Sequence, residues 1–153
     1  MSVHRILGTE LVRTHRHAHE NGPMTTGRAA SQDSPTWGFT EAWLLLSIGD
    51  HGRHGCTLAQ MIGTADARNH DIPTEEATAI VLGRLEASGL IEFSAKRLTA
   101  TKEGHRIVKQ RSGDFFGQAS SLLPLLAEVP CRDVLHRFEP GEFDSAYEAY
   151  AKR

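Results

Sequence analysis

Three groups of histidine, cysteine and acidic residues in this sequence could carry chemistry, and the first lies near the N-terminus. His15, His17 and His19 alternate in the stretch RTHRHAHE. Alternate residues of an extended chain point in one direction, and imidazoles bind borderline divalent metals. No carboxylate or cysteine partner can be assigned, so the histidines fall short of a closed structural site. We therefore favour a polar tail over a metal site.

The second group crowds the loop DHGRHGC, which contains Asp50, His51, His54 and Cys56. One interpretation is a zinc site completed by Asp50 or by a distant ligand. The other is a glycine-rich connector with a half-buried Cys56. The spacing matches none of the common zinc patterns, so we favour the connector.

The third group is polar and follows a predicted helix: Asp66, Asn69, His70 and Asp71. Histidine titrates near neutrality and could act as an acid or base. Asn and Asp also bond to local backbone between helices, and we favour that role because no nucleophile, oxyanion donor, phosphate loop or dinucleotide fingerprint accompanies them. We predict no enzyme, no catalytic residue, no cofactor and no metal.

Composition sets the broad class. The chain has 153 residues, 39% hydrophobic and 24% charged, with a net charge of -2. These values fit one globular domain and no overall basic field. Cys56 and Cys131 make no disulfide framework, and no apolar run approaches the roughly 20 residues of a membrane helix. We expect a cytoplasmic protein that does not enter a membrane.

The residues that most constrain the fold lie between Thr74 and Thr99. Thr74 is a helix cap, Glu75 and Glu76 oppose the helix dipole, and Gly89 is a stop. Strands are expected at 90–93 and 97–99 around a tight turn at 94–96.

Further helices are expected on both sides of this stretch. Thr40 would cap a helix over 41–49 and Thr57 one over 58–67. Thr101 or Thr99 would cap a helix over 102–111.

The C-terminal third should also be helical. The apolar residues after Phe115 predict a helix that bends or ends near Pro124. A last helix is expected over 142–151.

A known family carries the same pattern in this region. The residues Leu85-Glu86-x-x-Gly89-Leu90-Ile91, followed by Leu98-Thr99-x-x-x-x-Gly104, resemble the recognition helix and wing of bacterial MarR- and PadR-type regulators. The resemblance covers about 39–111. It implies a winged helix-turn-helix, mostly α with a small β-hairpin wing, plus C-terminal helices.

A second resemblance concerns the loop Asp66-Ala67-Arg68-Asn69-His70. It is similar to an Asp-x-x-Asn-His loop of small bacterial winged-helix proteins of unassigned role. This resemblance implies no activity.

The expected organisation has three parts: a weakly ordered tail over 1–36, a winged-helix core over 37–111 and a helical extension over 112–153. The tail composition cannot offset its ordering entropy by burial. Met24 is an alternative start to the chain.

Charge is unevenly distributed along the chain. Residues 74–88 carry a net -2, residues 94–111 a net +5 and residues 112–153 a net -3. Cations at 94–111 could contact phosphates or could form a solvated face. The expected DNA contacts come from the third helix and the wing: Thr74, Glu75, Ala79, Ile80, Arg84, Lys96, Arg97 and Lys102.

Two functions follow from these observations. The first is a transcriptional regulator that binds DNA through the third helix and basic wing. The second is a non-enzymatic winged-helix module that binds a protein and not DNA, because Glu75 and Glu76 at the start of the helix repel phosphates.

The predicted core contains Trp43, Leu45, Ile48, Leu58, Met61, Ile62, Val81, Leu85, Leu90, Ile91 and Leu98. Apolar residues beyond residue 111 must also be buried. They could fold back on the first helix or pair with a second copy, as regulators of this type often do, and we expect a homodimer.

Overall fold

The computed structural model of the protein describes residues 34–153. The predictions about His15, His17, His19 and Met24 fall outside the described residues, as does nearly all of the tail over 1–36.

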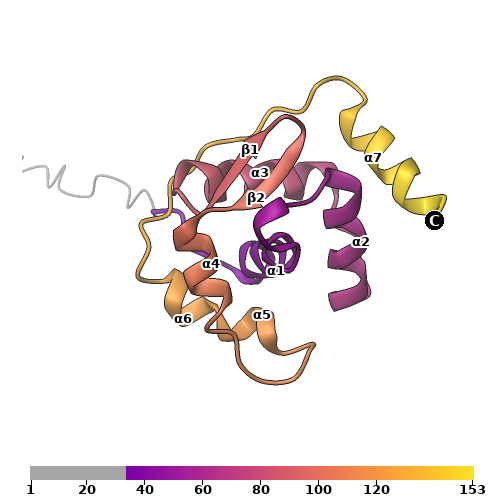
Figure 1. The fold of residues 1–153 in the computed structure, drawn as a ribbon. Coiled ribbons are helices and arrows are strands. Elements are labelled where there is room, and N and C mark those ends of the chain that lie inside the picture. The colour runs from indigo at the N-terminus through magenta and orange to yellow at the C-terminus, as the bar shows by residue number, and fades with distance from the viewer. Residues whose placement is uncertain (1–33) are drawn as a thin grey trace, which may run out of the picture. The chain divides into compact units, whose positions relative to one another are not determined.

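The described chain is mostly helical, with one two-stranded antiparallel hairpin (Figure 1). The elements in order are α1 (Phe39–Gly49), the 3-10 turn η1 (Gly52–His54), α2 (Leu58–Asn69), α3 (Glu75–Ala87), β1 (Ile91–Ser94), β2 (Arg97–Ala100), α4 (Lys102–Val108), α5 (Gln118–Ser121), α6 (Leu123–Leu126) and α7 (Glu142–Ala151).

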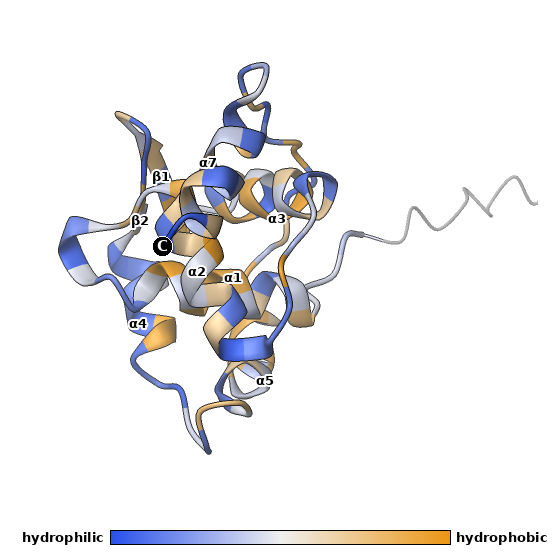
Figure 2. Ribbon diagram, turned by 90° about the vertical axis from the view of Figure 1, so that its right-hand side faces the viewer, coloured by the Kyte–Doolittle hydropathy of each residue, from blue (hydrophilic) through white to orange (hydrophobic). Residues whose placement is uncertain are grey.

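Helix α1 is the centre of the fold. Every residue from 41 to 48 is buried, because α2, α3, α4, α5, α6 and β2 all pack against this helix. Figure 2 shows α3 and α4 on different sides of α1. The helix begins one residue before the predicted cap, so the prediction that Thr40 caps it was wrong. Gly38 is the N-cap, and its N–H donates to the Glu41 carboxylate at 3.0 Å.

The caps of three later helices are confirmed. The hydroxyl of Thr57 accepts from Gln60 N–H in α2, that of Thr74 from the third residue of α3, and that of Thr101 from the third residue of α4. Each hydroxyl satisfies one backbone donor that the helix itself leaves unpaired. Helix α4 is shorter than predicted and ends at Val108.

The end of α3 sets the direction of the hairpin. Gly89 has φ +75°, and Leu90 N–H donates to Leu85 O at 2.9 Å, a glycine stop of the predicted kind. Strands β1 and β2 then pair with Ser94 opposite Arg97. The two turn residues between them have positive φ, 49° and 60°.

The loop after η1 adds an edge to the hairpin. Cys56 N–H donates to Leu98 O at 2.8 Å and Leu98 N–H donates to Cys56 O at 2.7 Å. Gly55 makes this approach possible, because a Cβ there would lie 2.3 Å from Leu98 O. Cys56 is fully buried rather than half-buried as predicted.

Residues 112–153 fold back on the helices before them. Helices α5 and α6 pack on α1, and α7 packs on α2. The predicted helix from Phe115 is instead two short helices, and Pro124 lies in the first turn of the second. Phe115 and Phe116 precede both helices and are 46% and 58% exposed. Helix α7 has the predicted bounds.

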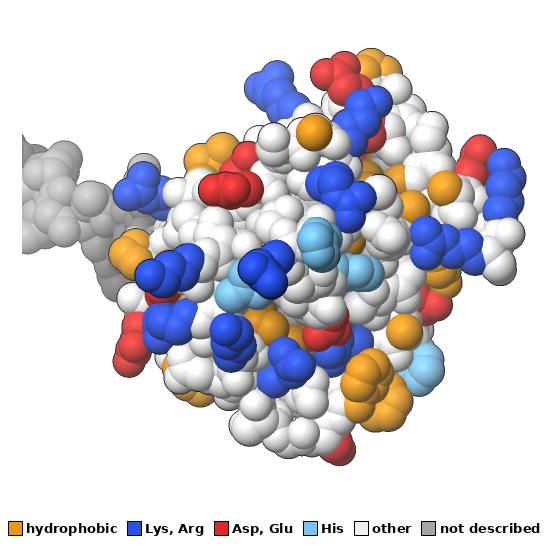
Figure 3. All heavy atoms as spheres, in the orientation of Figure 1, with side chains coloured by type: hydrophobic (Ala, Val, Ile, Leu, Met, Phe, Trp, Pro, Cys, Tyr) orange, Lys and Arg blue, Asp and Glu red, His pale blue; other side chains and the backbone are white. Residues whose placement is uncertain are grey.

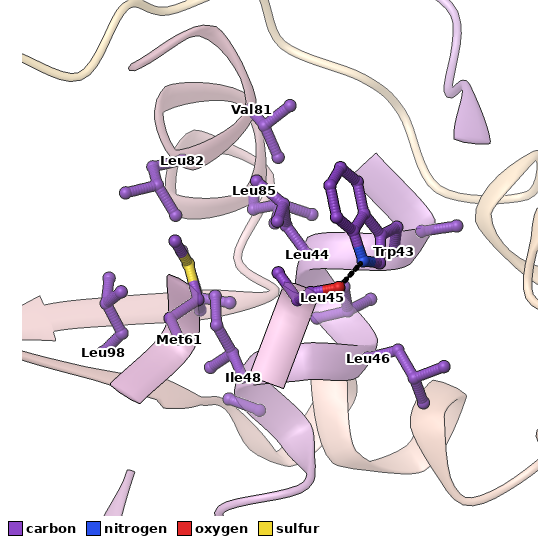
Figure 4. Packing of buried hydrophobic residues seen from close by; sticks show 14 of the residues in the cluster. Trp43, Leu44, Leu45, Leu46, Ile48, Met61, Val81, Leu82, Leu85 and Leu98 are labelled. Carbon is purple, nitrogen blue, oxygen red and sulfur yellow. Dashed lines mark hydrogen bonds between the residues drawn. The ribbon is translucent and has the colours of Figure 1, made fainter. Parts of the chain in front are cut away.

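The predicted core is confirmed, since all eleven residues are at most 5% exposed. Figure 4 shows side chains of α1, α2, α3 and β2 meeting in one cluster. The indole of Trp43 also donates to Ala65 O at 3.0 Å, which fixes α2 against α1.

Replacement of a central side chain tests this packing. Leu85 in α3 is fully buried, so Leu85→Ala should lower the free energy of unfolding by about 2–5 kcal/mol. The exposed neighbour provides a control, and Glu86→Gln should stay within about 0.5 kcal/mol of wild type. Chemical denaturation measures both, and a loss under about 1 kcal/mol for Leu85→Ala would contradict the packing.

Candidate functional site

The residues of α3 that were expected to contact DNA differ in their exposure to solvent. Thr74 and Glu75 are exposed at the start of the helix, but the Thr74 hydroxyl is engaged as the cap. Ile80 is half-buried and Ala79 is only 9% exposed. Arg84 is held by two carboxylates. The start of α3 is therefore exposed, whereas the outward face around Ala79 and Arg84 is partly covered.

The cover is an extended segment, residues 130–138, which we call the strap. It runs between α6 and α7, past α3 and the hairpin (Figure 1). His136 N–H donates to Ala79 O at 3.0 Å. Arg132 N–H donates to the Ser88 hydroxyl at 3.1 Å. These bonds fix the strap along about two and a half turns of the helix.

Gly83 allows the strap to reach the backbone of α3. A Cβ at this position would lie 1.8 Å from Val134 O and 2.5 Å from His136 N. Glycine inside a helix costs about 1 kcal/mol relative to alanine. The sequence therefore carries a helix-weakening residue at the point where only glycine leaves room for the strap.

Arg84 joins three parts of the fold. Its guanidinium bonds to Glu41 of α1 at 2.7 Å and to Asp133 of the strap at 3.0 Å. The Glu41 side chain is only 7% exposed, and a buried carboxylate needs such a partner. Arg84 is therefore committed to internal pairing and is poorly placed to contact a base.

Aromatic packing holds the far end of the strap. The His136 ring meets Phe93 of β1 edge-on at 4.9 Å and Phe138 at 4.8 Å. Phe138 in turn contacts Phe143 of α7 at 5.7 Å between ring centroids. Helix α7 is tied to α2 as well, since the Tyr150 hydroxyl donates to Asp66 at 2.5 Å.

The two predicted wing cations differ in their surroundings. Lys96 is exposed in the hairpin turn. Arg97 donates to the carbonyl oxygens of His54 at 3.0 Å and Gly55 at 2.9 Å. Arg97 is also exposed, but its guanidinium supports the loop after η1.

Lys102, predicted as a DNA contact beside the wing, belongs to a different surface. A groove of about 820 Å³ is lined by Arg53 of η1, by Lys102 and Arg106 of α4, and by Lys109, which caps the end of α4. We call it the basic groove, and Figure 3 shows Lys and Arg side chains gathered over this part of the molecule. The spacing of the α4 cations in the sequence signals one helix face. The approach of Arg53 is tertiary and has no sequence signal.

The side chains of His51 and Cys56, in the loop after α1, have structural roles. His51 Nε2 bonds to the Thr64 hydroxyl at 2.8 Å. Burial raises the pKa of the Cys56 thiol to about 12, so almost no thiolate forms near neutrality. Over residues 34–153, no three His, Cys, Asp or Glu side chains come together in a way that could hold a metal ion.

The polar loop after α2 is likewise used locally. His70 caps α2 in a left-handed conformation, φ 50°, and its N–H donates to Asp66 O at 2.7 Å. Asp71 accepts from the Ile72 N–H. Asn69 is exposed. His70 and Asp71 therefore support the turn between α2 and α3, and the Asp66 carboxylate binds α7.

The contact at Gly83 can be tested by adding one methyl group. Gly83→Ala should destabilise the protein by about 1–3 kcal/mol, because overpacking against the strap exceeds the gain in helix propensity. Gly63→Ala in α2 is the matched control, since its nearest contact is the Tyr150 ring at 3.3 Å, a side chain that can yield. Thermal and urea unfolding measure both variants. A stabilised Gly83→Ala protein would mean that the strap does not lie on α3.

Among the described helices, none is long and apolar enough to cross a membrane. Comparison of the chain with protein-family models, with curated proteins and with solved structures found no match.

Proposed function

We propose that residues 39–108 form a winged helix. The order of three helices, a hairpin and a further helix supports this proposal. The pairing of Cys56 with Leu98 supports it as well, because it adds a short third strand segment ahead of α2.

On this fold we propose a non-enzymatic interaction module that binds a protein through the surface over its third helix and does not read DNA bases. The observation that carries the proposal is the strap on α3. Backbone contact at Gly83 and ion pairing of Arg84 with Asp133 already use the outward face of that helix. The exposed residues that remain at its start include Glu75 and Glu76, which repel phosphates.

The strap offers a protein partner a new surface in place of α3. Val134 and Leu135 are 52% and 58% exposed. Together with Ile80, Arg84 and Asp133 they line a hollow of about 260 Å³. Exposed apolar side chains rimmed by charge are typical of protein contact sites.

A DNA-binding regulator is the second candidate. It is favoured by the exposed cations Lys96 and Lys102 on the hairpin and α4. In this candidate α3 can read bases only after the strap moves away, since Ala79 is only 9% exposed beneath it.

Selection from a random duplex library separates the two candidates. The module should enrich no sequence motif, either as wild type or as a Gly83→Ala/His136→Ala variant with a loosened strap. A motif enriched by wild type would overturn the module. A motif enriched only by the loosened variant would identify a regulator that the strap keeps inactive. Circular dichroism should first establish that the variant remains folded.

Self-association is a separate prediction. Folding back buries Leu122, Leu126 and Phe143, but Phe115, Phe116 and Tyr147 are 46%, 58% and 42% exposed. We expect light scattering at micromolar concentration to give the mass of a dimer. Phe115→Ser/Phe116→Ser should give a monomer, because it removes two adjacent exposed aromatic side chains. A monomer mass for wild type would rule out the homodimer.

A further inference from the structure

The basic groove brings together cations from two distant parts of the sequence. Arg53 reaches it from η1, Lys102 and Arg106 reach it from α4, and Lys109 reaches it from the cap at the end of α4. All four side chains are exposed. His105 also lines the groove, and its Nε2 is buried with no hydrogen-bond partner among the described residues.

Most of this charge is not neutralised locally. Glu103 pairs with Arg106 through two bonds, at 2.9 and 2.5 Å. Within residues 34–153, no carboxylate oxygen lies within 4.0 Å of the charged nitrogens of Arg53, Lys102 or Lys109. Such a concentration of like charge is repulsive, so an anion between the walls would relieve it.

The spacing of the cations favours a row of anionic groups over a single one. Residues 102 and 109 are seven positions apart, about 10 Å along a helix. One strand of duplex DNA has a phosphate for about every 3.4 Å of helix axis, so cations this far apart can contact different phosphates of one strand. Arg53 supplies a cation from the facing wall.

Charge elsewhere would direct an anion to this groove. Residues 74–88 carry a net -2 and residues 112–153 a net -3, whereas residues 94–111 carry a net +5. Helix α3 is therefore a poor surface for polyanions.

We propose that the groove between η1 and α4 binds linked phosphate groups, contacting them without reading bases. Lys102 and Lys109 bind different phosphates of one chain from one wall, and Arg53 contacts the same chain from the other. The source is either a nucleic-acid backbone or a free polyphosphate. This site is separate from α3. Failure of the phosphate site would therefore leave the proposed interaction module untouched, and the reverse also holds.

The test compares two variants that each lose two positive charges relative to wild type. Lys102→Ala/Lys109→Ala removes two groove cations. Arg132→Ala/Arg137→Ala removes two exposed cations of the strap. Fluorescence anisotropy with a labelled mixed-sequence duplex, at about 50–200 mM NaCl, gives affinity and its salt dependence. Calorimetry with inorganic tripolyphosphate provides the second arm, and circular dichroism checks folding.

The groove variant should weaken duplex binding and make the slope of log affinity against log salt shallower by about 1.8, or 0.9 for each lost phosphate contact. The strap variant should match wild type. That result supports a nucleic-acid backbone, and groove-dependent binding of tripolyphosphate alone supports a free polyphosphate. Equal losses in both variants, or no binding of either ligand at about 50 mM salt, would overturn the proposal.

Discussion

The whole fold depends on a helix that has no side suited to water. Helix α1 presents apolar residues almost all round, and Leu44, Leu45, Leu46 and Ile48 are fully buried. Such a helix is stable only when other elements surround it. Helices α2, α3 and α4 and strand β2 cover part of it, and α5 and α6 cover more. Residues beyond 111 are therefore needed to bury α1 completely.

The single acidic residue within this buried helix has consequences far from it. Glu41 satisfies the Gly38 N–H and binds Arg84. Arg84 then has one guanidinium edge left, and Asp133 of the strap occupies it. The partner of a buried carboxylate thus becomes an anchor for the strap. Arg84 is the only basic residue of α3. Because of these contacts, its side chain is not available to an external ligand.

This arrangement divides the molecule into faces with different chemistry. The strap covers part of α3, and its side chains Val134 and Leu135 are exposed apolar groups. The face of η1 and α4 holds exposed cations around an open groove. The proposed protein contact and the proposed phosphate contact use different surfaces, so one does not block the other.

The sequence by itself determined much of the local structure. Thr57, Thr74 and Thr101 cap their helices, and Gly89 ends α3. These outcomes depend on groups within a few residues of one another. The core list was also predictable, since apolar periodicity marks the buried face wherever the partner elements lie.

Tertiary structure alone decided what the faces of α3 and α4 can contact. The sequence around Gly83 does not indicate that the strap, about fifty residues later, contacts the Gly83 backbone. Nor does the chain near Arg97 indicate that its guanidinium supports the His54 and Gly55 carbonyls. The strap is extended and irregular, so it has no periodicity to reveal its position. Accessibility is a property of the packed chain, and a sequence pattern reports only which residues could make a contact.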